Sequence, residues 1–248
     1  MLNDNPGMKT IALIPARYAA TRFHGKLMQL LGDKTIIGHT YENTVATSLF
    51  DDVIVVTDSD IIFNEIIQNG GHAIMSKEQH ESGSDRIAEV VSDMEVDLVV
   101  NVQGDEPFVK RKALQDLLSA FENDPLQRTE VASLMFPITN EATIQNPNHV
   151  KVVVDKNGHA LLFSRSAIPF QRDKNITPSF FKHIGIYAYR KKALMNFTSW
   201  EITPLESVEK LEQLRYLENG VKIKMVLTDE NPVSIDTPED YANAKKLM

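Results

Sequence analysis

Three cations gather in one short segment that follows the first apolar run of the chain. The segment from Pro15 onwards contains Arg17, Arg22 and Lys26 within ten residues. Guanidinium and ammonium groups at this spacing could hold a triphosphate, which needs several hydrogen-bond donors at once. The Gly-x4-Gly-Lys-Ser/Thr pattern of a P-loop is absent. The same spacing also fits a solvated basic loop, so the residues alone leave both interpretations open.

Two acidic residues follow apolar runs in distant parts of the chain. Asp105 lies in Gln-Gly-Asp-Glu-Pro, directly after the run Asp97–Val102, and Asp236 follows a short run that ends at Ile235. A carboxylate at the end of a strand is well placed to bind Mg²⁺, which prefers oxygen ligands and substrate phosphates. For Asp105 the alternative is an ordinary Gly-Asp turn. The sequence does not show whether Asp105 and Asp236 meet.

Alternating strands and helices are predicted to position the basic segment after Pro15 and the acidic segment at Asp105. Strands at such spacing, joined by helices, form βαβ units and a mainly parallel sheet, whose ligands bind beyond the carboxyl ends of the strands. The predicted strands are Thr10–Ile14, Asp52–Thr57, Ala73–Ser76 and Asp97–Val102, and the helices are Thr35–Ser48, Asp60–Asn69 and Ser84–Met94.

The pattern changes after Lys110, where strands follow one another directly and a mixed sheet is expected. Asn157-Gly158 between two apolar runs predicts a hairpin turn, because both residues tolerate positive φ. The predicted strands are Val131–Pro137, Val150–Asp155, His159–Ser164, Lys182–Tyr189 and Lys222–Leu227, and the helices are Lys112–Glu122, Lys191–Ser199, Ser207–Asn219 and Pro238–Leu247.

Composition narrows the class of protein. The 248 residues carry a net charge of -8, with 42% hydrophobic residues and no cysteine. An acidic chain gains little from counterion release, so a nucleic-acid partner is not expected. The missing cysteines exclude disulfides, thiolate zinc sites and cysteine nucleophiles and fit a cytoplasmic protein. No apolar run reaches the ~18 residues of a membrane helix, so no membrane partner is expected.

Taken in order, the motifs resemble the 3-deoxy-manno-octulosonate cytidylyltransferase family, the CMP-Kdo synthetases. The resemblance covers the chain from Lys9 onwards. Single motifs are less specific than the ordered set, because the first is shared with CMP-sialate synthetases. Besides the three segments above, the matching stretches are His80–Arg86, Asn146–Lys151, Phe163–Pro169, His183–Tyr187 and Leu205–Arg215.

The resemblance implies a role for each matched residue. Lys26, Arg22, Asp105 and Asp236 would be catalytic, and the two aspartates would ligate Mg²⁺, with two ions expected. The residues that would bind CTP are Ala16, Arg17, Arg22, Lys26, Ser82, Gly83 and Gln103, and those that would bind the sugar are Gln103, Arg165, His183, Tyr187, Glu212 and Gln213. Each sugar-site residue has a plainer interpretation as a core or surface side chain.

The resemblance also implies a fold and a reaction. The fold would be α/β, a Rossmann-like three-layer nucleotide-diphospho-sugar transferase fold with a mainly parallel mixed sheet and a smaller C-terminal mixed α/β portion. Residues 1–8 would be a disordered tail and residues 9–248 a single domain, of which 9–125 bind mainly CTP and 126–248 serve mainly sugar binding and homodimer formation, returning to the metal site at Asp236. The enzyme would transfer CMP from CTP to Kdo for lipopolysaccharide synthesis.

Three positions depart from the family pattern. His24 and Leu27 stand where proline is common, and Ala20 stands where serine is common. Losing a proline frees φ, so a more mobile loop is expected. Alternative functions are a CMP-sialate synthetase, an amino-Kdo cytidylyltransferase and a non-catalytic nucleotide-sugar sensor. A dinucleotide-dependent oxidoreductase fits poorly, because no Gly-x-Gly-x-x-Gly follows the first strand.

Overall fold

The computed structural model describes residues 8–19, 23–78, 80, 82–122, 124, 126–230 and 233–248. Most of the tail predicted at residues 1–8 lies outside these ranges. The described residues form two compact units, one made of residues 8–111 and 233–248 and the other of residues 112–230. Both units combine helices with strands, which confirms the α/β class. In the described parts of the chain, no helix combines the length and apolar character needed to cross a bilayer.

The first unit is built on a parallel sheet. Its strands pair in the order β6 (Leu98–Asn101), β1 (Thr10–Ala16), β4 (Asp52–Thr57) and β5 (Ala73–Met75), and every pair is parallel. The register sets Ala16 opposite Thr57, so the carboxyl ends of β1 and β4 reach the same edge. Their apolar runs are buried as expected for strands covered on both faces.

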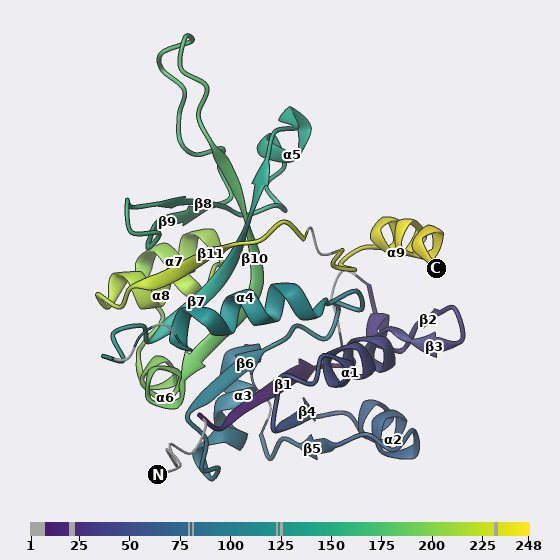
Figure 1. The fold of residues 1–248 in the computed structure, drawn as a ribbon. Coiled ribbons are helices and arrows are strands. Elements are labelled where there is room, and N and C mark those ends of the chain that lie inside the picture. Colours follow the sequence, from purple (N-terminus) through teal and green to yellow (C-terminus); the bar gives the residue numbers. More distant parts are fainter. Residues whose placement is uncertain are drawn as a thin grey trace, which may run out of the picture. The chain divides into compact units, whose positions relative to one another are not determined.

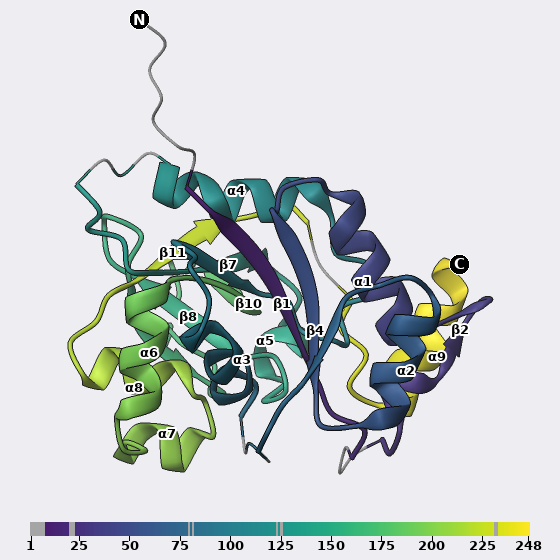
Figure 2. The same cartoon turned by 90° about the horizontal axis from the view of Figure 1, so that it is seen from below.

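Helices cover both faces of this sheet and complete three layers. Helices α1 (Ile36–Ala46) and α2 (Asp60–Gln68) lie on one side of β1 and β4, and α3 (Gly83–Ser92) lies on the other (Figure 2). The short elements of this unit are the 3-10 helices η1 (Lys26–Met28) and η2 (Lys245–Leu247) and the hairpin of β2 (Leu30–Leu31) and β3 (Lys34–Thr35).

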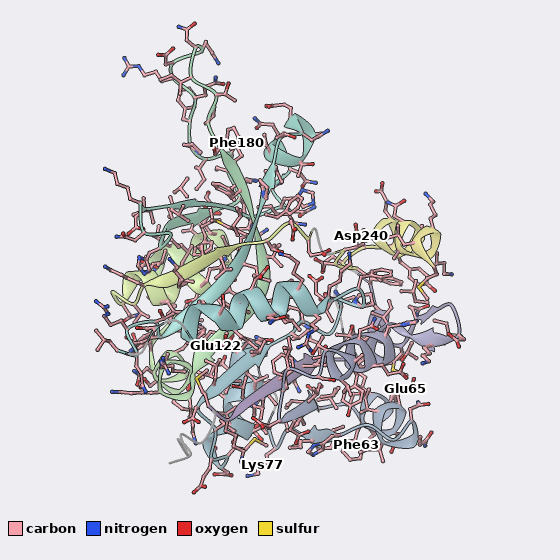
Figure 3. All side chains as sticks on the ribbon, viewed as in Figure 1. Phe63, Glu65, Lys77, Glu122, Phe180 and Asp240 are labelled. Carbon is pink, nitrogen blue, oxygen red and sulfur yellow. The ribbon has the colours of Figure 1, made fainter. Side chains whose placement is uncertain are left out.

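The last helix of the first unit, α9 (Pro238–Ala244), has a strong start signal. Thr237 accepts a hydrogen bond from the Asp240 backbone N–H, and the Asp240 carboxylate accepts one from the Thr237 N–H. Asp240 lies in the first turn (Figure 3), where its charge also complements the helix dipole. This cap fixes the direction of the chain directly after Asp236.

The second unit contains a mixed sheet, as the sequence predicted. Strand β7 (Val131–Ile138) pairs antiparallel with β10 (Phe180–Arg190) and parallel with β11 (Ile223–Leu227). Strands β8 (Lys151–Val154) and β9 (Ala160–Ser164) form a hairpin whose β8 also pairs with β10. The segment between β9 and β10 projects as a long loop (Figure 1), with Phe180 at its base (Figure 3).

The predicted helix at Ser207–Asn219 is wrong, because the structure has two short helices there. They are α7 (Pro204–Glu209) and α8 (Gln213–Glu218), separated by Lys210 at φ +53°. The Arg165 guanidinium donates to the carbonyl oxygens of Glu209 and Lys210, which the end of α7 leaves unpaired. A contact from Arg165, which directly follows β9, therefore stabilises the end of a helix that local propensity would continue. The other helices of this unit are α4 (Arg111–Glu122), α5 (Glu141–Gln145) and α6 (Lys191–Ser199).

A buried ion pair joins α7 to α8. The Arg215 guanidinium donates to both oxygens of Glu206, at 2.6 and 2.8 Å, and its carbon lies 4.1 Å from the centre of the Phe197 ring. The two side chains are only 7% and 8% exposed. A bidentate pair in this setting holds the two helices in one geometry.

We expect Arg215→Met to destabilise the protein by about 3–5 kcal/mol, because it leaves the Glu206 carboxylate buried without its cation. Lys34→Met is the matched control. It breaks the exposed Lys34–Glu42 pair and should cost less than about 1 kcal/mol. Urea unfolding of the two variants measures both quantities. Equal losses would show that burial of the pair contributes nothing.

Candidate active site

One ammonium group brings the two predicted acidic residues together. Lys26 Nζ lies 2.5 Å from Asp105 Oδ2 and 3.1 Å from Asp236 Oδ1. Lys26 begins η1, Asp105 follows β6, and Asp236 precedes the cap of α9, so three distant segments of the first unit meet at one point. The meeting of Asp105 and Asp236, which the sequence left open, is therefore observed.

The charges in this cluster compensate one another. Burial by itself lowers the pKa of Lys26, but the charges of Asp105 and Asp236 and their hydrogen bonds outweigh it and raise the pKa above its usual value. Lys26 is therefore fully charged at neutral pH. Its side chain is 13% exposed, against 19% for Asp105 and 42% for Asp236, so the cluster opens to solvent on the Asp236 side.

Backbone contacts fix the segment that carries Asp236. The N–H of Ile235 donates to the Asp105 carbonyl oxygen at 3.0 Å. The Tyr241 hydroxyl donates to the Leu30 carbonyl oxygen at 2.6 Å, and its ring lies against Phe23. These bonds dock the end of the chain onto the first unit and hold Asp236 next to Asp105.

Two glycines lie close to Pro15 in β1 and bring the predicted nucleotide-binding segments to that strand. A Cβ at Gly83 would lie 3.2 Å from a side-chain carbon of Pro15, and one at Gly104 would lie 3.1 Å from its carbonyl oxygen. Ser82 caps α3 by accepting from the Asp85 N–H. Gln103 lies beside Gly104 and donates to Asn101. The start of α3 and the end of β6 therefore both reach β1, as the topological rule for bound nucleotides requires.

The predicted phosphate-binding loop is described in part. Ala16 is the buried last residue of β1, and Arg17 is exposed directly after it. Arg22 and Ala20 lie outside the described residues, so their predicted roles stay predictions. His24, one of the departures, packs its ring edge-on against Tyr18 with ring centres 5.2 Å apart.

In the second unit, Arg165 is occupied by backbone carbonyls. Besides Glu209 and Lys210 at the end of α7, its guanidinium donates to the Pro147 carbonyl oxygen at 3.1 Å. The Arg165 carbonyl in turn accepts from the buried ammonium of Lys151 at 2.6 Å. Arg165 therefore organises the backbone here, and its predicted contact with a sugar carboxylate stays a prediction.

His183 and Tyr187 lie together on β10. Their ring centres are 5.3 Å apart, and Phe163 contacts His183 from β9. Burial, helped by Lys182, lowers the pKa of His183 to about 3. Burial also raises the pKa of Tyr187 well above its usual value, with further contributions from Tyr189 and Glu212. Both side chains are therefore neutral at physiological pH.

Glu212 and Gln213 lie at the start of α8. Gln213 is buried, and Glu212 is half-buried and close enough to raise the pKa of Tyr187. Glu212 therefore lies near Tyr187, and the predicted sugar-binding roles of the two residues stay predictions. The plainer alternative, that one of the two merely faces solvent, does not hold for Gln213, which is buried.

Three residues that the sequence analysis did not assign to a site contact the predicted sugar-site residues Arg165 and His183. Lys151 donates to three carbonyl oxygens, those of Asn146, His149 and Arg165. Glu209 accepts from Ser164 and from the Arg165 N–H. Ser133 contacts His183. A lysine at the start of the apolar run Lys151–Val154 was a visible signal, since a buried cation needs partners, whereas nothing local distinguishes Ser133.

The donors in the first unit fit a magnesium ion. The carboxylates of Asp105 and Asp236 converge on one cation, the Lys26 ammonium. Mg²⁺ commonly uses one or two carboxylates and takes its remaining ligands from water and phosphate. Within the described ranges, no group of three or more His, Cys, Asp or Glu side chains could hold a metal. The site therefore suits an ion completed by a substrate phosphate.

Comparison with known proteins identifies the family of the chain. A family model described as cytidylyltransferase matches residues 11–223. The 3-deoxy-manno-octulosonate cytidylyltransferase of Flavobacterium johnsoniae is 60% identical over 241 residues, covering 97% of this chain and 99% of the relative. Its counterpart in Christiangramia forsetii is 53% identical over 240 residues, covering 97% of each chain.

A solved structure extends the comparison to the fold. CMP:2-keto-3-deoxy-manno-octonic acid synthetase complexed with CTP superimposes with a TM-score of 0.91 at 36% identity, covering 97% of this chain and 98% of that one. The matching family model and relatives identify the chain as a nucleotidyltransferase, and a parallel sheet with acidic residues beyond its strand ends is compatible with that class. The chain belongs to the cytidylyltransferases, and among them to the 3-deoxy-manno-octulosonate cytidylyltransferase family. This confirms the resemblance drawn from the ordered motifs.

The lowered pKa of His183 predicts a pH dependence of stability. The unfolded chain takes up this proton near pH 6.5, whereas the folded chain does so only near pH 3. Stability is therefore lost as the pH falls through this window, by roughly tenfold in the folding equilibrium per pH unit. In His183→Gln this contribution should vanish. Urea unfolding of both proteins between pH 7 and pH 4 compares the slopes, and identical slopes would contradict the assignment.

Proposed function

We propose that this enzyme transfers CMP from CTP to the anomeric hydroxyl of Kdo and releases pyrophosphate, for lipopolysaccharide synthesis. The observation that carries the proposal is the convergence of Asp105 and Asp236 on Lys26 in the first unit. Relatives named for this activity match nearly the whole chain, and the solved relative with a TM-score of 0.91 is a complex with CTP.

In this reaction the anomeric oxygen forms a bond to the α-phosphorus of CTP. The bond between that phosphorus and the bridging oxygen breaks, pyrophosphate leaves with the bonding electrons, and the hydroxyl proton passes to water. No covalent intermediate with the protein is needed, which agrees with the absence of cysteine. Catalysis then consists mainly of positioning and charge neutralisation.

Residues of the first unit can supply both the positioning and the charge neutralisation that this reaction needs. Arg17, exposed at the end of β1, is placed to donate to phosphate oxygens, and Arg22 is proposed to join it. Lys26 is charged and can exchange a carboxylate partner for the phosphate of the leaving group. Ser82, Gly83 and Gln103 are proposed to face the base and ribose, because close contacts to Pro15 bring their segments to β1.

Magnesium belongs to the proposal as the ion that Asp105 and Asp236 would hold. When bound, Mg²⁺ would lower the pKa of the attacking hydroxyl and neutralise phosphate charge, and a second ion would be held largely by the phosphates. The side chains of Asp105 and Asp236 are 19% and 42% exposed, so solvent reaches both and an ion that arrives with CTP could reach them too.

The sugar is assigned to the second unit. Neutral Tyr187 can donate a hydrogen bond, and neutral His183 can accept one, so the pair suits the hydroxyl groups of an acidic sugar. Arg165, Glu212 and Gln213 complete the proposed set.

The proposal extends to a cytoplasmic homodimer. CTP is a cytoplasmic nucleotide, which supports that location. Large apolar side chains are exposed on β9 and on the loop that follows it: Leu161 is 62% exposed, Phe170 86% and Ile176 64%. Such side chains are typical of protein contact surfaces. Sedimentation equilibrium at micromolar concentration measures the mass directly, and we expect that of two chains.

The first assay measures pyrophosphate release from CTP and Mg²⁺ with Kdo, with amino-substituted Kdo, with sialic acid or with no sugar. We expect release with Kdo. Release with sialic acid alone, or with the amino sugar alone, would keep the chemistry and replace the sugar. If no sugar gave pyrophosphate release, the proposed activity would be overturned and the nucleotide-sugar sensor would be favoured.

A second assay tests the acidic pair. Asp105→Asn and Asp236→Asn should each lower kcat by roughly 100-fold or more, because the ligands of the metal lose their charge. Chelation of Mg²⁺ should stop the wild-type reaction, and added Mg²⁺ should restore it. Asp116→Asn, on α4 in a pair with Lys112, is the control and should keep full activity. Full turnover by Asp105→Asn would remove the metal assignment.

A further inference from the structure

The hydroxyl of Ser133 lies at the centre of a small buried network in the second unit. Ser133 is on β7, is fully buried, and lies opposite Tyr187 on β10. Its Oγ lies 3.0 Å from His183 Nε2, 2.9 Å from the Ile186 carbonyl oxygen and 3.1 Å from the Ile184 carbonyl oxygen. A single side chain thus contacts both the backbone of β10 and a proposed sugar-site residue.

This network lies at a β-bulge in the pairing of β10 with β7. Ile184 pairs with Leu134, but the next residue of β7, Ser133, pairs with Tyr187, so two residues of β10 are extra. A bulge of this kind turns carbonyl groups out of the ladder and redirects side chains. Ser133 satisfies the carbonyl oxygens of the bulge, and the two extra residues leave His183 and Tyr187 on the same face.

The proton count fixes the tautomer of His183. The Ser133 hydroxyl has one proton, and carbonyl oxygens only accept. If that proton went to His183 Nε2, both carbonyl oxygens would face oxygen lone pairs at about 3 Å. The consistent arrangement has Ser133 share its one proton between the two carbonyl oxygens in a bifurcated bond, while His183 Nε2–H donates to Ser133. Because burial keeps the ring neutral, Nδ1 then carries a lone pair.

We propose that Ser133 is a positioning residue of the sugar site: it holds His183 as the Nε2–H tautomer, so that Nδ1 accepts a hydrogen bond from a sugar hydroxyl. The ring contacts with Phe163 and Tyr187 fix the plane of the imidazole. The hydrogen bond to Ser133 fixes which nitrogen carries the proton. This inference rests on the proposed function for the identity of the ligand, but not for the tautomer itself.

Kinetics test the positioning role. Ser133→Ala should raise the KM for Kdo by roughly tenfold, the effect of one lost hydrogen bond, and leave the KM for CTP unchanged. Ser133→Thr keeps the hydroxyl and should recover most of the affinity. Ser199→Ala is the matched control, an exposed serine on α6 of the same unit that donates to a local carbonyl. Equal rises of both KM values in Ser133→Ala would indicate a merely structural role and overturn the proposal.

The tautomer can be measured without any variant of Ser133. In protein labelled with ¹⁵N-histidine, the ring nitrogen shifts of His183, assigned by comparison with His183→Gln, should show a protonated Nε2 and a bare Nδ1. A protonated Nδ1 would overturn the inference whether or not the enzyme accepts Kdo. Conversely, absence of pyrophosphate release with a confirmed Nε2–H tautomer would reject the proposed function and not the geometry at Ser133.

Discussion

One ammonium group holds together two carboxylates that reach it from positions 79 and 210 residues further along the chain. Neither the pair of carboxylates nor the ammonium would be stable alone at this partly buried position. Two adjacent carboxylates repel each other, and burial of an unpaired ammonium favours its neutral form. The cluster therefore requires the end of the chain to return to the first unit. The bond from Ile235 to Asp105 and the cap of α9 are the local structures that make this return possible.

The strands were the most predictable part of the fold. Apolar runs such as Asp52–Thr57 are bounded by turn residues, and the structure has a strand with those same limits. Prediction failed at α7 and α8, because Lys210 adopts a left-handed conformation that its own side chain does not favour. The contact that ends α7 comes from Arg165, which lies far away in the sequence. Local propensity cannot include such a contact.

The candidate site was likewise predictable only in part. Asp105 and Asp236 were each visible as an acid after an apolar run, yet only the fold shows that they share Lys26. The ordered motifs identified the family because they carry information that no single residue has. Ser133 was invisible to both approaches. A serine inside an apolar strand has no local signal, and its function depends on a bulge in the neighbouring strand.

The two units offer different chemistry to the two proposed substrates. In the first unit, charged groups compensate one another and can exchange partners when a triphosphate arrives, which suits a ligand that brings its own charge. In the second unit, burial keeps His183 and Tyr187 neutral, so the imidazole keeps one acceptor nitrogen and the phenol keeps a hydroxyl that can donate. Fixed neutral donors and acceptors discriminate between sugars more sharply than charges do, since a ligand that lacks a matching hydroxyl leaves a buried polar group unpaired. The discrimination depends on each group keeping a single protonation state, and for His183 the Ser133 hydroxyl selects which nitrogen holds the proton.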